Sequence, residues 1–227
     1  MKKSPLILML AALVLPLSSA ATVTLVQTLD PGFYNNNIGT LLNLSNTGTD
    51  TCAEPFPVSN DCSATYPTAP SLSAASSKLG NWLTDPFHLN GFWTGSPIAI
   101  PNQWTVGTEV AVIYQFNTLG ATGVLAKFGV DNGIFVWLDG SYLLGRRDPG
   151  THSLGEYSLP IGDLTSGTHF LQLLLEDHGQ TNGYDVLITA DTFIQGPAPG
   201  APAPEPGSLA LLGLGLAALG FGRRKKA

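Results

Sequence analysis

The stretch from Val124 to Leu144 reads VLAKFGVDNGIFVWLDGSYLL, and it decides the fold. Its apolar runs are short and rich in β-branched and aromatic residues. Two groups of turn residues separate them, Asp131–Asn132–Gly133 and Asp139–Gly140. Asn-Gly and Asp-Gly are typical of tight hairpin turns, because both turn residues must tolerate a positive φ. We therefore expect a meander of three strands, over 124–130, 134–138 and 142–144.

The sequence on both sides continues this β pattern. Residues 22–28 alternate apolar and polar residues, and 168–176 form a long apolar run that is typical of a strand. In Glu109–Asn117 both faces carry apolar side chains, including Ile113, which predicts a strand inside a sandwich. Short strands at turn-marked spacing, without a convincing amphipathic helix, predict an all-β fold, a jelly-roll-like β-sandwich.

Residues 30–78 differ from this pattern, because they are polar and rich in Asn, Ser, Thr, Gly and Pro. We expect them to form the loop-rich part of a domain over 22–195, with the jelly-roll-like core at 80–193. Cys52 and Cys62 lie ten positions apart in this part. Outside the cytoplasm such a pair is expected to form a disulfide, which would stabilise the domain by about 2 to 3 kcal/mol. A metal site is the alternative, although no His lies near either cysteine.

The C-terminal end has a composition of its own. Residues 196–206 read GPAPGAPAPEP, an extended semi-rigid linker. Residues 207–222 carry no charge, and as a helix they would cover about 24 Å, slightly less than a hydrocarbon core of about 30 Å. Flanking residues and local thinning can close that gap. We expect a transmembrane helix at 207–222 rather than a buried core helix. The basic end at 223–227 should stay in the cytoplasm.

The N-terminal end predicts the same topology. A basic start at Met1–Lys3 is followed by an apolar run over 5–17 and by small residues at 18–21. This three-part pattern is typical of a secretory signal peptide, here 1–21, that signal peptidase would remove after Ala20 or Ala21. An uncleaved anchor is the alternative. Everything before residue 207 would then lie outside the cytoplasm.

The charge balance of the middle region limits its partners. Residues 22–195 keep four of the ten basic residues and fifteen of the sixteen acidic ones, a formal net charge of −11 against −6 for the whole chain. Such a domain is repelled by nucleic acid and by anionic membrane surfaces. We expect no nucleic-acid partner. The length of this region suits one domain with its own core.

The tail also carries a family resemblance. Pro204–Glu205–Pro206, the apolar run and the basic cluster Arg223, Arg224, Lys225 and Lys226 resemble the PEP-CTERM sorting signal of exported bacterial proteins. This resemblance implies an inner-membrane precursor that faces the periplasm. It further implies that an exosortase, a membrane cysteine transpeptidase, cuts near Pro-Glu-Pro and releases the protein to the cell surface or an extracellular polymer matrix. An exopolysaccharide is then a candidate partner.

The middle region carries a second resemblance. Trp104–Phe116, Phe128–Gly140 and Leu164–Leu175 resemble the jelly-roll of galactose-binding-like and PA14-like domains, over about residues 80–193. Some PA14-like adhesins hold Ca²⁺ and sugar with a paired-Asp turn. This chain has Asp131–Asn132 there, with one charge fewer. This resemblance implies a fold, and a fold does not assign a ligand.

Acidic and amide side chains at turn ends are the candidate cation ligands, because Ca²⁺ takes six to eight oxygen ligands from such loops. These candidates are Asp131, Asn132, Asp139, Glu176 and Asp177. The alternative is that Asp131–Asn132–Gly133 only forms a turn in which the side chains bond their own backbone. We expect no resident cofactor, with Ca²⁺ as the candidate ion.

The sequence gives little sign of catalysis. It has no Gly-x-Ser-x-Gly elbow, nucleotide-binding loop or zinc pattern, and its four histidines lack metal-ligand spacing. Glu176–Asp177–His178 has the composition of a proton-transfer cluster, yet general acid–base work needs a partner at a defined distance. Trp82, Trp93, Trp104 and Trp137 are either core residues or a sugar-stacking platform.

Three functions remain in order of preference. The first is an exported, exosortase-processed protein of the cell surface or matrix that is not an enzyme. The second is a carbohydrate- or Ca²⁺-binding module, and the third is a hydrolase. All three share one localisation, so the tail does not choose between them.

Overall fold

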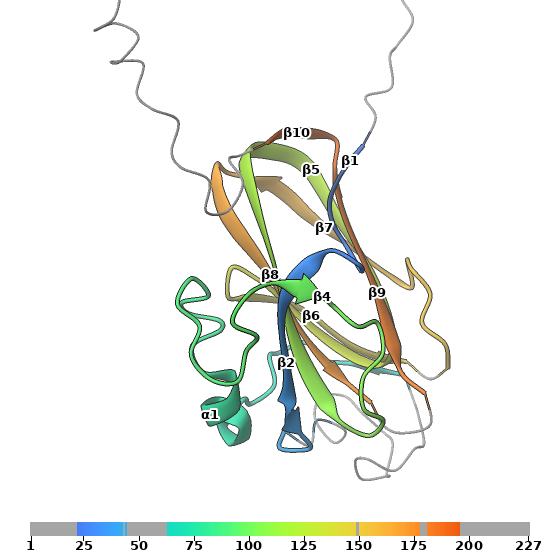
Figure 1. Cartoon of the computed structure of the whole chain (residues 1–227). Helices are drawn as coiled ribbons and strands as arrows, with labels where there is room; N and C mark the ends of the chain where they lie inside the picture. Colours follow the sequence, from blue (N-terminus) through green and yellow to red (C-terminus); the bar gives the residue numbers. More distant parts are fainter. Residues whose placement is uncertain (1–21, 43, 45–62, 149, 178–180, 196–227) are drawn as a thin grey trace, which may run out of the picture.

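The computed structural model describes residues 22–42, 44, 63–148, 150–177 and 181–195. These residues are mostly strands, with one 3-10 turn and one short helix (Figure 1). The elements are β1 (Val23–Gln27), β2 (Pro31–Gly39), β3 (Ala64–Thr65), η2 (Ser73–Ala75), α1 (Ser76–Leu79), β4 (Ile98–Ala99), β5 (Glu109–Leu138), β6 (Ser141–Asp148), β7 (Tyr157–Leu164), β8 (Gly167–Glu176), β9 (Gly183–Ala190) and β10 (Thr192–Gln195). The predicted all-β fold is confirmed.

Strand β5 organises the fold, because its thirty residues form three consecutive legs. The first leg, 109–118, pairs with β8 and β2. The second, 121–131, pairs with β9 and β7. The third, 132–138, pairs with β6 and with the other edge of β8. The first and third legs are both antiparallel to β8, so they run in the same direction on either side of it.

These pairings fold one continuous ten-stranded sheet into two layers. The front layer has the order β4, β2, first leg of β5, β8, third leg of β5, β6, β3. The back layer has the order β1, β9, second leg of β5, β7. Strand β10 pairs with residues 118–122, where β5 bends over the end of the sandwich (Figure 1).

The main core lies between the layers. Alternate residues of each strand point inward, as Leu171, Leu173 and Leu175 do on β8. Full burial of one such side chain contributes about 1.5 to 3 kcal/mol. The buried members of this core are Val26, Tyr34, Ile100, Val110, Val112, Tyr114, Phe116, Ala121, Val124, Ala126, Phe128, Val130, Ile134, Val136, Leu138, Leu171, Leu173, Leu175, Tyr184, Val186, Ile188 and Ala190.

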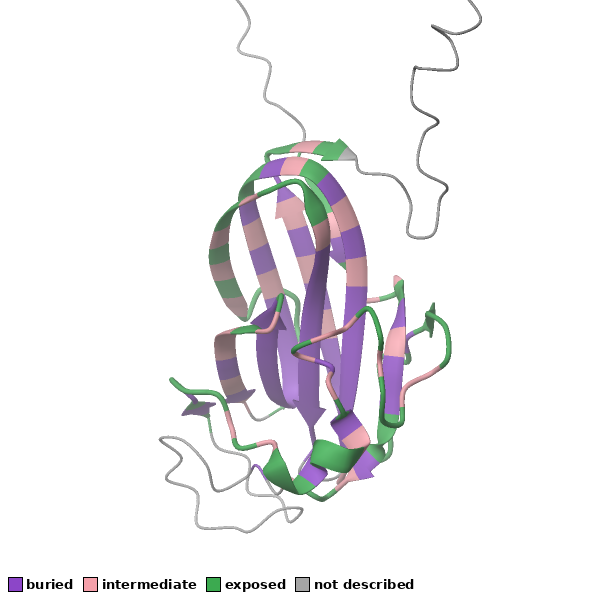
Figure 2. Cartoon of the chain, turned by 90° about the vertical axis from the view of Figure 1, so that its left-hand side faces the viewer, coloured by how far each residue is buried: buried purple, intermediate pink, exposed green. Residues whose placement is uncertain are grey.

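A second apolar cluster covers the outer face of the front layer. Ala111 and Ile113 of β5 pack there against residues of the 64–83 segment, such as Leu79 and Trp82. Strand β5 is therefore buried on both faces over 109–114 and again over 128–138, while burial alternates between these ranges (Figure 2). The two-sided burial that the sequence predicts at Ile113 is confirmed, because its side chain is fully buried.

Two turn predictions have opposite outcomes. Asp139–Gly140 is a two-residue hairpin between β5 and β6, with Leu138 opposite Ser141 and φ angles of 50° and 76°. The predicted turn at Asp131–Asn132–Gly133 is wrong, because 124–130 does not pair with 134–138. The chain instead passes there from the back layer to the front layer.

The predicted loop-rich segment begins with a regular strand, which corrects that prediction. Strand β2 runs through the polar residues Asn35 and Asn36 and pairs with β5 through Phe33, Tyr34 and Asn35. Asn35 is tolerated in a buried position because its side-chain amide donates to the carbonyl of Lys78 at 2.8 Å.

Several predictions fall outside the described residues. They concern the signal peptide with its cleavage at Ala20 or Ala21, the disulfide between Cys52 and Cys62, the linker, the apolar run at 207–222 and the basic end. No helix within the described ranges has the length and hydropathy needed to cross a membrane.

Candidate functional site

The sandwich has two ends: the chain ends lie at one of them, and four of the five candidate cation ligands lie at the other. Val23 pairs with Ala190 and Gln195 pairs with Thr118, so both ends of the described domain leave at the bend of β5 (Figure 1). At the other end Glu109 pairs with Glu176. Nine residues of extended strand separate Thr118 from Glu109, which corresponds to about 30 Å. We call these the terminal end and the acidic end.

Asp131 and Asn132 lie at the acidic end, where β5 changes layer. Both side chains are buried, and the peptide bond between them is cis. One carboxylate oxygen of Asp131 accepts a hydrogen bond from the Asn132 amide at 2.7 Å. The other accepts from the Thr181 hydroxyl at 3.1 Å. Where β5 passes from one layer to the other, Asp131 therefore bonds to its neighbour Asn132 and to Thr181.

Glu176 belongs to a buried row of charged residues on the outer face of the front layer. Cross-strand partners share a face, and the register places Glu109, Glu176 and Arg147 in one row, with Gly133 between Glu176 and Arg147. All three charged side chains are buried. Gly133 leaves the space that the Glu176 side chain occupies, because a Cβ at Gly133 would overlap it.

Asp177 ends β8 and fixes a neighbouring loop. Its side chain is fully buried, and one carboxylate oxygen accepts a hydrogen bond from the backbone N–H of Gly107. Nearby, the Asn182 side chain accepts from the N–H of Trp104 and donates to its carbonyl, both at 3.0 Å. The loop that leads into β5 is thus held by two polar side chains of the 177–182 region.

Asp139 lies apart from the other candidates. It follows Leu138, which pairs with Leu171, whereas the acidic end lies at Glu176. One carboxylate oxygen accepts from the backbone N–H of Phe170 at 2.8 Å, and the other lies 2.7 Å from Nδ1 of His169. The five predicted cation ligands therefore do not form one site. Asp131, Asn132, Glu176 and Asp177 all lie at the acidic end, where Asp131 and Asn132 bond each other, and Asp139 stabilises a hairpin elsewhere.

Within the described ranges, no group of three or more His, Cys, Asp or Glu side chains is placed to hold a metal ion. The histidines there bind single carboxylates. His88 lies 3.1 Å from Asp85, and His152 lies 2.9 Å from Asp185. Any Ca²⁺ at the acidic end would therefore depend on amide and carbonyl oxygens in addition to carboxylates. His178 lies outside the described residues.

The tryptophans do not form an exposed platform. Trp82 and Trp137 are buried in the second cluster, with their rings 5.4 Å apart. Trp93 and Trp104 are half-buried, and their indole N–H groups donate to the carbonyls of Leu79 and Thr108. The core interpretation is therefore correct for Trp82 and Trp137, and the other two rings are fixed by hydrogen bonds.

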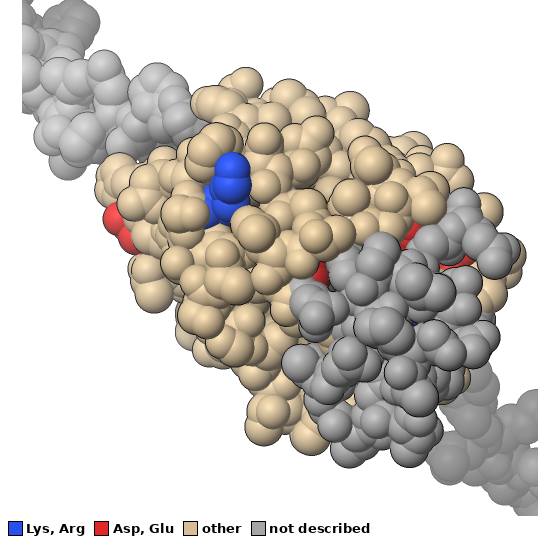
Figure 3. All heavy atoms as spheres, turned by 90° about the horizontal axis from the view of Figure 1, so that it is seen from below, with Lys and Arg blue, Asp and Glu red and all other residues tan. Residues whose placement is uncertain are grey.

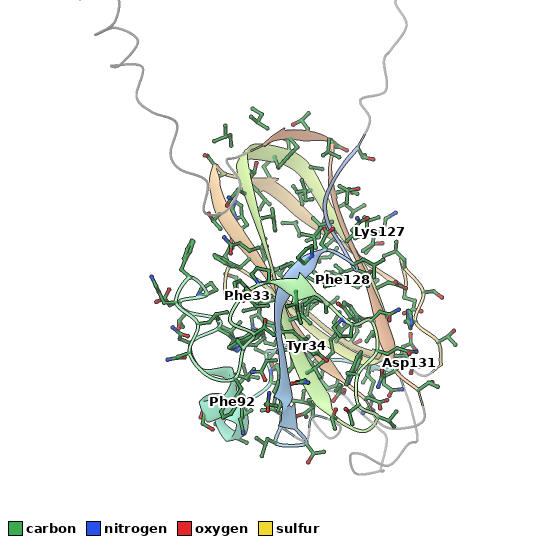
Figure 4. All side chains as sticks on the ribbon, viewed as in Figure 1. Phe33, Tyr34, Phe92, Lys127, Phe128 and Asp131 are labelled. Atoms are coloured by element: carbon green, nitrogen blue, oxygen red, sulfur yellow. The ribbon has the colours of Figure 1, made fainter. Side chains whose placement is uncertain are left out.

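Sequence reasoning missed the exposed aromatic residues. Phe87 and Phe92 are 63 % and 49 % exposed, and both lie on the 80–95 segment that follows α1. In Figure 4, Phe33 and Phe92 lie on one side of the sandwich and Asp131 on the other. A signal was present in the sequence, because Phe87 stands in the turn-rich run TDPFHLNG.

The comparisons with known proteins identify the tail. Residues 202–226 match the PEP-CTERM protein-sorting motif. The chain ends in a PEP-CTERM sorting signal. The protein is therefore an exported one that is targeted to exosortase, and the motif implies anchoring of the precursor in the membrane. The search of curated proteins found no match.

Two solved structures resemble the described domain at low identity. The PA14 domain of the MpAFP antifreeze protein is 14 % identical, covers 75 % of this chain and 88 % of that chain, and has a TM-score of 0.33. A GH31 alpha-xylosidase from Xanthomonas citri is 12 % identical, covers 42 % of this chain and has a TM-score of 0.26. The match spans only 12 % of the xylosidase.

Proposed function

We propose that this PEP-CTERM protein is a non-catalytic component of the cell surface or extracellular matrix, delivered there by exosortase. The observation that carries the proposal is the sorting motif at 202–226, which follows β10 after a short linker. The β-sandwich is then the part that remains after processing. Its strongly negative middle region agrees with a soluble domain that contacts neither nucleic acid nor anionic lipid.

The placement of the chain ends supports this arrangement. Both ends leave at the terminal end, so an anchored precursor would point its terminal end toward the membrane and its acidic end away from it. An extended linker over 196–206 would reach about 34 Å at about 3.1 Å per residue. The Pro-Glu-Pro sequence would thus stand clear of the sandwich, where a membrane enzyme can reach it.

The acidic residues support a structural rather than a catalytic role. Asp139 and Asp177 accept hydrogen bonds from the backbone N–H groups of Phe170 and Gly107. Asp131 accepts hydrogen bonds from the side chains of Asn132 and Thr181. Each of these carboxylates stabilises a turn or loop of the sandwich. Such use of Asp at turns is common in β proteins.

The test is expression of the full chain with and without an exosortase. We expect a shortened, released product only with the enzyme. Changing Pro204, Glu205 and Pro206 together to Ala should leave the full-length form in the membrane fraction. A matched control changes Pro197 and Pro199 to Ala, outside the matched motif. Equal processing of the two variants would contradict the proposal, and measurable hydrolase activity of the released domain would contradict its non-catalytic part.

The second candidate is a Ca²⁺-dependent carbohydrate-binding module. The observation that favours it is the position of Asp131, Asn132 and Asp177, which all lie at the end of the sandwich opposite the chain ends. Ligand linkage predicts a stabilisation of about 2.7 kcal/mol when Ca²⁺ is present at one hundred times its dissociation constant. Thermal unfolding in EDTA and then in millimolar Ca²⁺ would show this as a rise of several degrees. An unchanged Tm would remove this candidate.

A further inference from the structure

A groove lies on the outer side of the front layer, between β2 and the 86–95 segment. Its volume is about 350 Å³, at the small end of the range for ligand sites in proteins. Phe33, Phe87 and Trp93 line it with aromatic rings, and His88 and Thr94 line it with polar groups. It is separate from the acidic end, because Phe33 pairs with Ile113 in the middle of the first leg of β5.

The segment that forms this groove is held in one conformation by its own hydrogen bonds. Asn81 and Asn90 bond each other through side-chain oxygens and backbone N–H groups, at 2.7 and 3.0 Å. The Asn81 amide also donates to the His88 carbonyl at 2.9 Å. Gly91 has a φ of 100° and packs so close to Lys78 that a Cβ would overlap its carbonyl. A rigid segment of this kind loses little entropy when a ligand binds.

The aromatic rings of the groove are also fixed. Phe87 packs the edge of its ring against buried Phe170, at 4.8 Å between centroids and an interplanar angle of 86°, and still leaves 63 % of its surface exposed. Trp93 stacks on Trp82 at 5.7 Å. The exposed ring of Phe87 adjoins Phe33 and Trp93 in the groove, and an exposed apolar patch next to polar groups indicates a binding surface.

The polar groups and charges indicate what kind of ligand fits. His88 lines the groove, and its side chain is 83 % exposed, so it can exchange hydrogen bonds with hydroxyl groups. Asp85 does not line the groove, but it lies 3.1 Å from Nδ1 of His88 and orients that ring. No Lys or Arg is among the described residues that line the groove. Seen from below, at another face of the molecule, the uncovered surface carries isolated charged residues among uncharged ones (Figure 3). Lys78 lies next to the groove, over the ring of Phe92, and does not line it. The lining itself therefore offers no cation to an anionic polymer, whereas its aromatic rings and His88 suit an uncharged one.

We propose that this groove binds a segment of an uncharged polysaccharide. The apolar face of a sugar ring stacks on Phe87, and its hydroxyl groups bond to His88. This assignment deepens the proposed function by naming the matrix component that the domain contacts. It rests on the proposed function for the presence of a matrix polymer around the domain. The two can fail separately, because the tail would still be processed if the groove bound nothing.

The test is affinity electrophoresis of the full chain, kept in mild detergent, through gels with neutral glucan, mannan or galactan and through gels with anionic alginate. We expect retardation by at least one neutral polymer and none by alginate. Phe87→Ala should weaken binding at least about tenfold, or about 1.4 kcal/mol. His88→Ala, which keeps the aromatic rings, should also weaken it.

Phe92→Ala is the matched control, because Phe92 is exposed on the same segment, contacts Lys78 and does not line the groove. It should bind like the unchanged chain. Equal loss in Phe87→Ala and Phe92→Ala, retardation by alginate alone, or no retardation by any neutral polymer would overturn the assignment. Binding that disappears in EDTA but survives Phe87→Ala would place the sugar at the acidic end instead. Exosortase processing, measured in parallel, separates failure of the groove from failure of the proposed function.

Discussion

The hydroxyl oxygens of Tyr114 and Tyr184 lie 2.6 Å apart in the core, and this contact joins the two layers of the sandwich. Tyr114 belongs to the first leg of β5 and Tyr184 to β9. The Tyr114 hydroxyl donates to the carbonyl of Thr28 at 2.9 Å, so the Tyr184 hydroxyl must donate to Tyr114. Burial raises the pKa of both phenols, which keeps them neutral and able to donate.

The direction of this chain of hydrogen bonds predicts unequal effects of two similar mutations. Tyr184→Phe removes one donor and leaves Tyr114 bonded to Thr28, so it should cost about 1 kcal/mol. Tyr114→Phe leaves both the buried Tyr184 hydroxyl and the Thr28 carbonyl without this partner, and should cost about 2 to 3 kcal/mol. Urea unfolding measures both. Tyr142→Phe is the control, because its half-buried hydroxyl makes one bond to the Tyr66 carbonyl. An equal or larger loss in Tyr184→Phe would contradict the assigned direction.

Buried tyrosines also predict how stability depends on alkaline pH. Burial raises the pKa of Tyr34 to about 12, above the value of about 10 in an unfolded chain. The folded state therefore holds the phenol proton more tightly. Its contribution is fully present below about pH 10 and is lost as the pH rises toward about 12, by about 1.4 kcal/mol per pH unit for each such group. Urea unfolding at pH 8, 10 and 11 should show this decrease. A Tyr34→Phe variant should show a smaller one, and an identical slope would exclude Tyr34 as a cause.

Gly133 should be sensitive to the addition of a single methyl group. A Cβ there would overlap the side chain of Glu176, which is fully buried and cannot move into solvent. We expect Gly133→Ala to destabilise the domain by about 1 to 3 kcal/mol. Gly95→Ala is the control, because a Cβ at Gly95 meets open space. Similar unfolding midpoints for the two variants would show that Glu176 is free to rearrange.

The fold class and several strands could be predicted from local sequence. Alternation over Glu109–Asn117, the apolar run before Glu176 and the Asp139–Gly140 turn each depend on neighbours in the chain, and each is found in the structure. Local pattern fails at Asp131–Asn132–Gly133. These residues resemble a hairpin turn, but the leg that follows pairs with β8, a strand more than thirty residues further along the chain.

The candidate site was harder to predict, because burial and partners are set by tertiary packing. Asn35 looked like a loop residue, and only its bond to the Lys78 carbonyl explains its place in a strand. The sequence left the tryptophans open between core and sugar-stacking platform, and only the packing of buried Trp82 on buried Trp137 decides for the core. Phe87 is exposed because the Asn81–Asn90 pair fixes the loop around it, and residue type alone does not reveal that pairing.

Mutation of Asp139 can show whether this residue stabilises the hairpin or binds a cation. Its φ of 50° is unfavourable for Ala but is tolerated by Asn, whose side-chain oxygen could still accept from the Phe170 N–H. Asp139→Ala should therefore cost about 2 kcal/mol, and Asp139→Asn less than about 1 kcal/mol. Neither change should alter the Tm difference between EDTA and Ca²⁺, since Asp139 lies far along β8 from the acidic end. A Ca²⁺ response that Asp139→Asn abolishes would make Asp139 a ligand and would contradict its role as a hairpin residue.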